Sequence, residues 1–360
     1  MLVRYGRARV EEILPAQALE LAAAALLRLG EAPEPEDAGD RERLLAMLES
    51  EAGAAGEPDP RGLAEAVLRK LQTEGWLERE PGRGETRLLL HPGFLEMVSL
   101  KALRSLRPPR SRTGAGHWPR PGRTGPHEPH GTARPWRWGE PLALDATETL
   151  KELVFRGELT AAGLRVREGE GGNRAAVALL LDCSHSMVLY GVDRFGPAKR
   201  LALALHRWLG GQGDRLEVIC FHDVAERVAP GRIPFLRAQP SHTNIQAALA
   251  TARAWLRRQG EMERRVLLVT DGRPTAMSLG GGGLYKNAWG RDPRIERATL
   301  AAAARLRREG AELDIYLLED DPLVEEAARE LARAARGRLL PVDPAQLGRR
   351  VLADLSAGRR

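Results

Sequence analysis

The sequence predicts an α/β protein in which a doubly wound, mostly parallel, Rossmann-like sheet follows a smaller N-terminal helical domain. Two observations carry this prediction. In the C-terminal half, short apolar runs typical of buried strands alternate with helix-like segments, which is the order of a parallel sheet covered on both faces. The first hundred residues instead contain three segments with the apolar spacing of helices. With 360 residues, 43% of them hydrophobic, the chain is long enough for both domains.

Residues 1–100 are predicted to form a mainly helical domain that ends in a hairpin. The stretches AQALELAAAALLRLG, DRERLLAMLES and RGLAEAVLRKLQTEGWLE have helical spacing, and GWLEREPGRGETRLLLHPG indicates two short strands around a Gly-rich turn. Helices followed by such a hairpin resemble a winged-helix module, in which Arg83 and Arg87 would contact nucleic acid. Three acidic residues of the same stretch favour a protein-contact or packing role instead: Glu78, Glu80 and Glu85.

Residues 101–140 are predicted to be a basic arm between the two domains. From Lys101 to Trp138 there are nine Lys or Arg residues and one acidic residue, Glu128, whereas the net charge of the whole chain is +6. We therefore expect the positive charge on the arm and not on a folded face. Seven prolines and five glycines exclude a continuous helix there, and the tryptophans indicate that the arm docks on a folded part. The HEPH motif at 127–130 is not predicted to bind metal, because its proline prevents helical His pairing.

The C-terminal domain is predicted to span residues 141–360, with a lead-in segment before a core at 172–356. Five apolar runs are predicted as strands: 175–182, 216–223, 264–272, 313–320 and 337–343. Helix-like segments separate most of them: 195–209, 244–258, 293–309, 322–335 and 344–356. Residues 225–230 are predicted to return as a short antiparallel edge strand. A doubly wound sheet places its ligand site at the carboxyl ends of its strands.

Polar side chains collect at those strand ends. The first strand runs into Asp182, Ser184 and Ser186, the third ends at Asp271, and Thr243 stands just before the helix between them. Extended geometry directs the first three side chains to one side. A buried carboxylate without a partner is costly, and carboxylate and hydroxyl oxygens are the donors that Mg²⁺ prefers. The sequence therefore predicts a divalent-cation site, with Mg²⁺ as the cofactor and Mn²⁺ as the alternative ion.

The Asp-x-Ser-x-Ser motif that begins at Asp182, the TN pair that contains Thr243 and the TDG motif that contains Asp271 resemble the metal-ion-dependent adhesion site of von Willebrand factor type A (vWA) domains. The resemblance extends over the predicted core of the domain. It implies three direct metal ligands: Ser184, Ser186 and Thr243. It implies that Asp182 and Asp271 act through water or hydrogen bonds, and that an acidic side chain of a protein partner completes the coordination.

A narrower resemblance concerns RPWRWGEPLALDATETL at 134–150 and TDGRPTA at 270–276. These stretches are similar to bacterial cytoplasmic vWA proteins, including those paired with MoxR-type AAA+ ATPases and relatives of the magnesium chelatase D subunit. This resemblance implies an adaptor in metalloenzyme maturation or complex remodelling, with the ATPase or its client as partner. SLGGGGLYKNAWG at 278–290 lacks the Gly-Lys-Ser/Thr of a phosphate loop, so no ATPase activity is expected.

The resulting prediction is a non-enzymatic, Mg²⁺-dependent interaction protein in the cytoplasm. Two alternatives stay open: a metal-dependent hydrolase that uses His185 or His242, and a nucleic-acid binder that uses the basic arm. The N-terminus lacks the apolar centre of a signal peptide, and no apolar run is long enough to span a bilayer. The only cysteines, Cys183 and Cys220, are expected at the ends of adjacent strands as small buried core residues, with a redox pair as the alternative.

Overall fold

The computed structural model describes most of the two predicted domains and little of the segment between them. The described residues are 15–29, 38–80, 87–106, 133–135, 149, 151, 164–167, 174–189, 192–260, 262–287 and 289–357. The predicted basic arm therefore lies outside the described residues, apart from residues 101–106 and strand β3 (Ala133–Pro135), which pairs antiparallel with β4 (Arg165–Arg167). The tryptophans of the arm and its HEPH motif also lie outside them.

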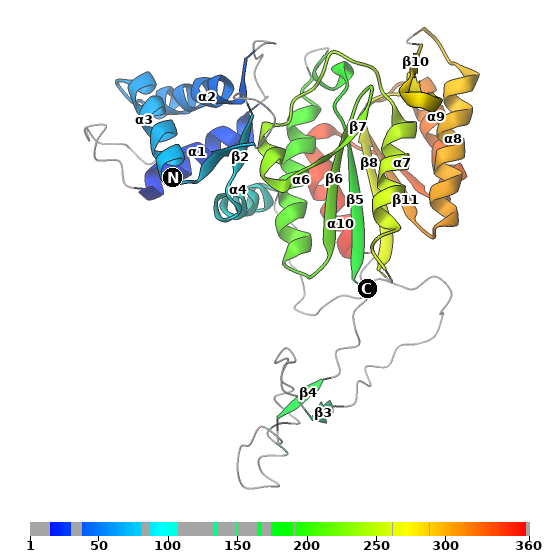
Figure 1. Ribbon diagram of the computed structural model, residues 1–360, viewed down its shortest axis with the longest axis horizontal. Helices are drawn as coiled ribbons and strands as arrows, with labels where there is room; N and C mark the ends of the chain where they lie inside the picture. The colour runs from blue at the N-terminus through cyan, green and yellow to red at the C-terminus, as the bar shows by residue number, and fades with distance from the viewer. Residues whose placement is uncertain are drawn as a thin grey trace.

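A six-stranded sheet forms the centre of the C-terminal domain (Figure 1). Its strands are β5 (Ala175–Asp182), β6 (Arg215–Phe221), β7 (Ala225–Val228), β8 (Glu263–Thr270), β11 (Glu312–Leu317) and β12 (Arg338–Pro341). Their order is β12-β11-β8-β5-β6-β7, and every neighbouring pair is parallel except β6 with β7. The predicted α/β fold with a mostly parallel sheet is confirmed, and so is its short antiparallel edge strand.

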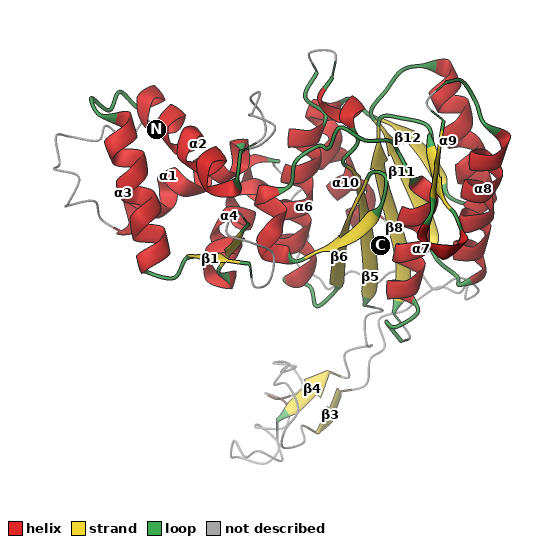
Figure 2. Ribbon diagram, turned by 45° about the horizontal axis from the view of Figure 1, so that its top comes forward, coloured by secondary structure: helices red, strands yellow, loops and turns green. Residues whose placement is uncertain are grey.

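Helices cover both faces of this sheet (Figures 1 and 2). One face carries α6 (Phe195–Gly210) and α10 (Leu347–Ala357), and the other carries α7 (Ile245–Leu256), α8 (Pro293–Arg308) and α9 (Pro322–Ala335). The side chains of β5 alternate between the two cores. Val177 and Leu179 pack with α6, whereas Ala178 and Leu180 pack with α7 to α9. Burial on both sides explains why this strand is a continuous apolar run in the sequence.

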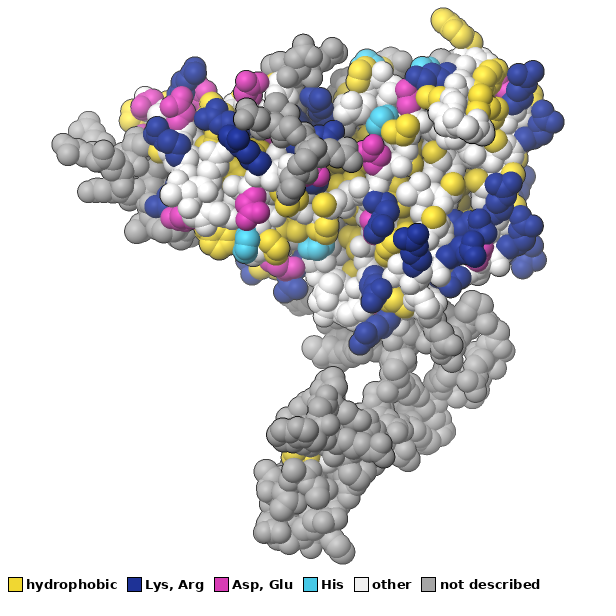
Figure 3. Space-filling view, in the orientation of Figure 1, with side chains coloured by type: hydrophobic (Ala, Val, Ile, Leu, Met, Phe, Trp, Pro, Cys, Tyr) yellow, Lys and Arg dark blue, Asp and Glu magenta, His cyan; other side chains and the backbone are white. Residues whose placement is uncertain are grey.

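Basic side chains gather on the outer side of α7 and α8 (Figure 3). The exposed arginines at these helices are Arg257, Arg258, Arg294, Arg297, Arg305, Arg307 and Arg308. The expectation that no folded face would be basic is therefore wrong. The net charge outside the arm is near neutral, so the composition alone does not reveal this face. Acidic and basic side chains lie on different parts of the folded surface. Arginines in the last turn of α8 also interact favourably with the negative end of the helix dipole.

The N-terminal part is a helical domain with a hairpin, as predicted. Its elements are α1 (Pro15–Arg28), α2 (Asp40–Ala54), α3 (Pro60–Thr73), β1 (Leu77–Arg79), β2 (Leu88–Leu90) and α4 (Pro92–Ser105). The start of α3 follows from its sequence, since Asp59 accepts a hydrogen bond from the Gly62 amide at 3.0 Å and Pro60 occupies the first turn. Helix α4 runs through the boundary predicted at residue 100.

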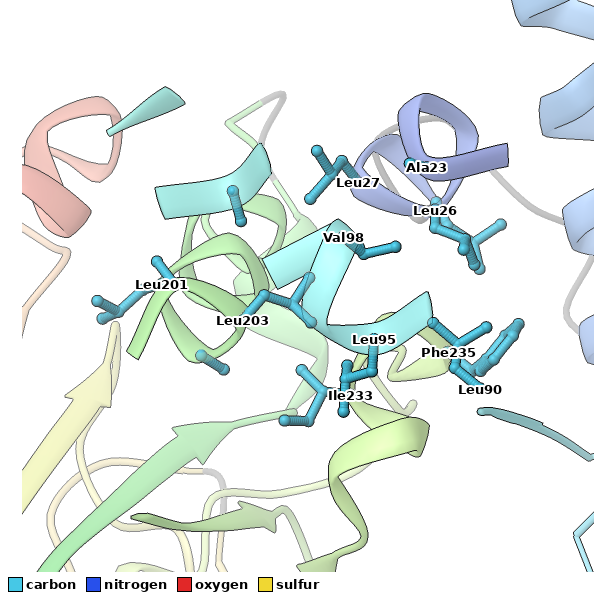
Figure 4. Close-up of a cluster of buried hydrophobic side chains, with 14 of the residues drawn as sticks. Ala23, Leu26, Leu27, Leu90, Leu95, Val98, Leu201, Leu203, Ile233 and Phe235 are labelled. Carbon is cyan, nitrogen blue, oxygen red and sulfur yellow. The ribbon is translucent and has the colours of Figure 1, made fainter. Parts of the chain in front are cut away.

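The two domains share one hydrophobic core, in which α4 packs against α6 (Figure 4). Val98 of α4 lies between Leu26 of α1 and Leu203 of α6, and Ile233 and Phe235 of the 3-10 helix η4 (Pro230–Phe235) extend the same cluster. Because these side chains are almost completely buried, the N-terminal domain is packed directly against the sheet domain.

Polar contacts fix the same interface. Arg232 of η4 pairs with Asp40 of α2 and donates to the Leu88 carbonyl of β2, while the Leu88 amide donates to Asp40 at 2.9 Å. Arg43 donates to the Phe235 carbonyl at 3.1 Å. These contacts join the hairpin and α2 to η4, which follows the edge strand of the sheet.

Candidate metal centre

The predicted site residues lie at the carboxyl ends of adjacent strands. Asp182 is the last residue of β5, and Asp271 follows the last residue of β8, the strand that pairs with β5. Ser184 and Ser186 belong to the turn after β5, which continues as the 3-10 helix η3 (His185–Val188). The parallel register of the two strands brings the five-residue Asp-x-Ser-x-Ser segment beside Asp271.

Asp182 is completely buried and has an internal partner for each carboxylate oxygen. Its Oδ1 accepts a hydrogen bond from the Ser184 amide at 2.9 Å, and its Oδ2 accepts one from the Thr270 hydroxyl at 2.5 Å. The carboxylate therefore shapes the turn that carries the serines. The sequence prediction did not assign this role to Thr270, the first residue of the TDG motif.

The two serine hydroxyls form a hydrogen-bonded series that ends at Asp271. The Oγ atoms of Ser184 and Ser186 are 3.2 Å apart, and Ser186 Oγ donates to Asp271 Oδ1 at 2.8 Å. Thr243 is nearly buried and lies close to these residues, but its hydroxyl is not part of their hydrogen-bonded series. A β-carbon built on Gly272 would lie 3.8 Å from Thr243 Oγ1, and in the described part of the protein no hydrogen bond connects this hydroxyl to the other four residues.

Burial makes the charged forms of the two carboxylates at this site unfavourable. Burial raises the pKa of Asp182 to about 7, and the nearby Asp271 carboxylate acts in the same direction. Burial also raises the pKa of Asp271, against the lowering effects of the Ser186 hydroxyl and Arg194. Among the described residues no group of three or more His, Cys, Asp or Glu side chains could hold a metal, so a cation at this site would need hydroxyls as its remaining donors. Two buried carboxylates with three hydroxyls fit Mg²⁺.

A family model described as "Rv0959-like protein, vWA domain" matches residues 175–356, which is half of the chain. The chain belongs to the Rv0959-like vWA family. The uncharacterized proteins Rv0959 of Mycobacterium tuberculosis and Mb0984 of Mycobacterium bovis are each 33% identical to it over 244 residues. This alignment covers 64% of the chain, and the chain spans 36% of the length of these relatives.

A solved structure shows a more distant similarity to this chain. The vWF domain of the type V pili tip protein Mfa5 from Porphyromonas gingivalis is 12% identical, with a TM-score of 0.41 and coverage of 52% of this chain and 96% of that chain. The vWA assignment made from the sequence is confirmed by the family match. vWA domain proteins are in general non-catalytic interaction modules.

The vWA domain of this protein places a buried arginine beside its candidate metal centre. Arg194 Nη1 lies 3.8 Å from Asp271 Oδ2 and has no hydrogen-bond partner, whereas Nη2 pairs with Glu319 at 2.6 Å. Its Nε donates to the Leu318 carbonyl, at the end of β11, at 3.1 Å. The guanidinium therefore compensates part of the charge of Asp271. The vWA motif contains no signal for this residue.

The histidines near the vWA motif do not form a base–nucleophile pair within the described residues. His185 is exposed, and its amide approaches the Ser241 carbonyl at 3.5 Å. His242 Nδ1 lies 3.4 Å from Asp223 Oδ1, and the His242 amide donates to the same oxygen at 3.0 Å. These contacts position the loop before Thr243. They do not favour the hydrolase alternative, which needs an imidazole within hydrogen-bond reach of a nucleophile.

The cysteines of the vWA domain form a disulfide between β6 and the end of β5. Cys183 and Cys220 are joined, with their Cα atoms 6.1 Å apart. The expectation of two separate core thiols is therefore wrong, because the two sulfur atoms are bonded to each other. The alternative of a redox pair stays a prediction. The parallel register pairs Cys220 with Leu181, so Cys183 lies diagonally across from it, within the Cα separation of disulfides.

The hairpin residues give little support to nucleic-acid binding. Arg87 lies 3.9 Å from Glu80, so its charge is partly compensated, and Arg83 lies outside the described residues. In the part of the chain that the structure describes, no helix is long and apolar enough to cross a membrane.

Proposed function

We propose that this chain is a non-enzymatic, Mg²⁺-dependent protein-interaction module. The observation that carries this proposal is the hydrogen-bonded array of Asp182, Ser184, Ser186 and Asp271 at the carboxyl ends of two adjacent parallel strands. Two buried carboxylates need positive charge, and Arg194 supplies it to one of them only. A divalent cation fits this requirement, with Mn²⁺ as the alternative to Mg²⁺.

In this proposal three hydroxyls are the direct ligands: Ser184, Ser186 and Thr243. Asp271 accepts from the Ser186 hydroxyl, and Asp182 holds the Ser184 amide, so both carboxylates orient ligands. Neutral ligands leave the ion most of its positive charge. When bound, the ion therefore supplies a Lewis-acidic position at which a carboxylate from a partner protein replaces water.

The proposed partner is a MoxR-type AAA+ ATPase or its client, in metalloenzyme maturation or complex remodelling. The support for this is the resemblance of residues 134–150 and 270–276 to the vWA proteins that work with such ATPases. The proposed location is the cytoplasm. The disulfide between Cys183 and Cys220 is an observation against that location, because disulfides are rare in reducing compartments such as the cytoplasm.

The metal site is tested by removing its hydroxyls. The Ser184→Ala/Ser186→Ala variant should lose Mg²⁺ binding in titration calorimetry, because a methyl group cannot coordinate the ion. Its far-UV circular dichroism should remain that of the wild type, since both residues lie in a turn beyond β5. Ser356→Ala, which removes a hydroxyl that donates within α10, is the matched control and should keep the wild-type affinity. Unchanged Mg²⁺ affinity in the double variant would show that these residues do not form the metal site.

A further inference from the structure

The exposed large hydrophobic side chains of the described residues all lie at one end of the sheet. Trp289 is 90% exposed, and the others are 42–56% exposed. The full set, which we call the apolar rim, is Val188, Val192, Val224, Leu279, Trp289 and Leu323. A single exposed apolar residue is ordinary on a protein surface. The location of the whole set in one region is the informative observation.

Every member of the apolar rim follows the carboxyl end of a strand. Val188 and Val192 follow β5, Val224 follows β6, and Leu323 opens α9 after β11. Leu279 and Trp289 belong to the excursion after β8, which contains the hairpin of β9 (Ala276–Ser278) and β10 (Leu284–Lys286). The candidate metal centre lies at the ends of β5 and β8, so rim members follow these two strands and also β6 and β11, their neighbours on either side. Figure 3 shows hydrophobic side chains at this end of the molecule, above β10.

The β9–β10 hairpin is attached to the loop that carries Thr243. The Thr275 amide donates to the Thr243 carbonyl at 2.9 Å, and the Thr275 hydroxyl accepts from the Thr243 amide at 3.0 Å. Asn244 donates to Ser278 Oγ at 3.1 Å, and Lys286 pairs with Asp223 on the opposite side of the loop. These contacts hold the hairpin in a fixed position next to a predicted ligand.

Trp289 has its own support at the base of this hairpin. Its amide donates to Asn287 Oδ1 at 2.9 Å, and the Asn287 side chain donates to Asp292, the N-cap of α8, at 3.1 Å. The Tyr285 hydroxyl donates to the same carboxylate at 2.9 Å. Hydrogen bonds thus hold the Trp289 amide while its indole ring is exposed to solvent, and a backbone held in this way loses less entropy when a partner covers the ring.

We infer that the apolar rim docks a protein segment in which one Asp or Glu is flanked by apolar side chains. This inference rests on the proposed function and specifies its partner. The carboxylate matches the positive charge of the bound ion, and apolar neighbours match the rim. Apolar contacts around a central charge exclude water from it, which strengthens the ionic contact. Tryptophan is a common anchor of such interfaces because it buries a large area with few rotatable bonds.

The test is a selection of random displayed peptides on the full chain in Mg²⁺, followed by affinity measurements on an enriched peptide. The enriched peptides should share an acidic residue with apolar neighbours. Trp289→Ala should weaken binding by about tenfold or more, Trp289→Phe should retain most of it, and the exposed Arg257→Ala on the basic face should match the wild type. Enrichment of peptides without apolar neighbours, or no enrichment, would overturn the inference.

The outcomes separate this inference from the proposed function. Peptide binding that is lost in EDTA and in Asp271→Ala, yet is unchanged in Trp289→Ala, would support the metal-dependent module. The same result would refute docking on the apolar rim. Binding that survives both EDTA and Asp271→Ala refutes the module itself. Sedimentation with phosphatidylcholine–phosphatidylglycerol vesicles is the control for a membrane. Vesicle binding that needs Trp289 and ignores EDTA would show that the rim faces lipid and would also refute the inference.

Discussion

At the scale of single residues, the centre of the molecule is a pair of carboxylates removed from water. Asp182 is completely buried and Asp271 nearly so. Hydrogen bonds from Ser184, Thr270 and Ser186 hold them in place, yet burial still raises the pKa of both groups. Their charged forms are therefore unfavourable in the protein alone, and a cation at the serine hydroxyls would restore them.

The raised pKa of Asp182 predicts a dependence of stability on pH. With a pKa of about 7 in the folded protein and 3.8 as its ordinary value, Asp182 keeps a proton that the unfolded chain has lost in this window. The metal-free protein should therefore lose stability as pH rises from about 4 to about 7. Mg²⁺ favours the charged carboxylate, so the increase in Tm on adding Mg²⁺ should be larger at about pH 8 than at about pH 5. Equal increases at both pH values would contradict this account.

Arg194 predicts an effect on metal affinity. Its guanidinium lies 3.8 Å from Asp271, so it repels a cation bound at the hydroxyls beside that carboxylate. Arg194→Gln should tighten Mg²⁺ binding by roughly tenfold, a modest part of the Coulomb energy of a unit charge a few ångströms away. The variant should also lower Tm in EDTA, because Glu319 loses its partner. Arg194→Lys keeps the charge and should stay near the wild-type affinity. Calorimetry that finds equal or weaker Mg²⁺ binding in the Gln variant would rule out this role.

The sequence predicted the positions of the site residues better than their surroundings. Asp182, Ser184 and Ser186 lie within one turn, and strand pairing then requires Asp271 to be their neighbour. Arg194 could not be predicted in the same way. Its contacts depend on how the loop before α6 crosses the end of β11, and no local pattern in the sequence reports such a crossing.

At the scale of elements, the strands and helices of the sheet domain followed from their apolar patterns. Strand β5 occupies 175–182 as predicted, because burial on both faces leaves an uninterrupted apolar run. The disulfide did not follow from such patterns. It depends on the register of β5 with β6, and register between parallel strands is set by packing along their whole length.

The disulfide predicts a dependence of stability on reductant. Cys183 and Cys220 close a loop with a sequence separation of 37, so Cys220→Ala should lower the free energy of unfolding by about 2–4 kcal/mol under oxidising conditions. Denaturant unfolding curves of wild type and variant should become much more similar in excess dithiothreitol, where neither protein has the bond. A variant as stable as the oxidised wild type would show that the bond does not form in solution.

At the scale of the whole molecule, the two domains form one packed body. The sequence contains a signal for this in α6, where five consecutive residues from Leu201 to Leu205 are all buried. A helix that is apolar on all sides is covered on all sides. One side of α6 faces the sheet, and α4 covers another. The identity of the covering element could not be predicted, because many apolar helix faces would fit α6 equally well.

The interface between the domains predicts the effect of a single methyl group. At Gly231 of η4 a β-carbon would lie 2.6 Å from the Leu90 carbonyl and 2.9 Å from a Leu89 methyl, so the hairpin must move away. Gly231→Ala should lower the free energy of unfolding by about 1–3 kcal/mol and increase proteolysis of the N-terminal domain.

Gly210→Ala, at a position with no atom within 4 Å of the added carbon, should cost little. Mg²⁺ affinity should stay unchanged in both variants, because η4 supplies none of the metal-site contacts described above. A Gly231→Ala protein with the unfolding midpoint and protease resistance of Gly210→Ala would show that the hairpin is not seated on η4 in solution. Loss of Mg²⁺ binding in Gly231→Ala without unfolding would instead reveal that domain docking controls the metal site.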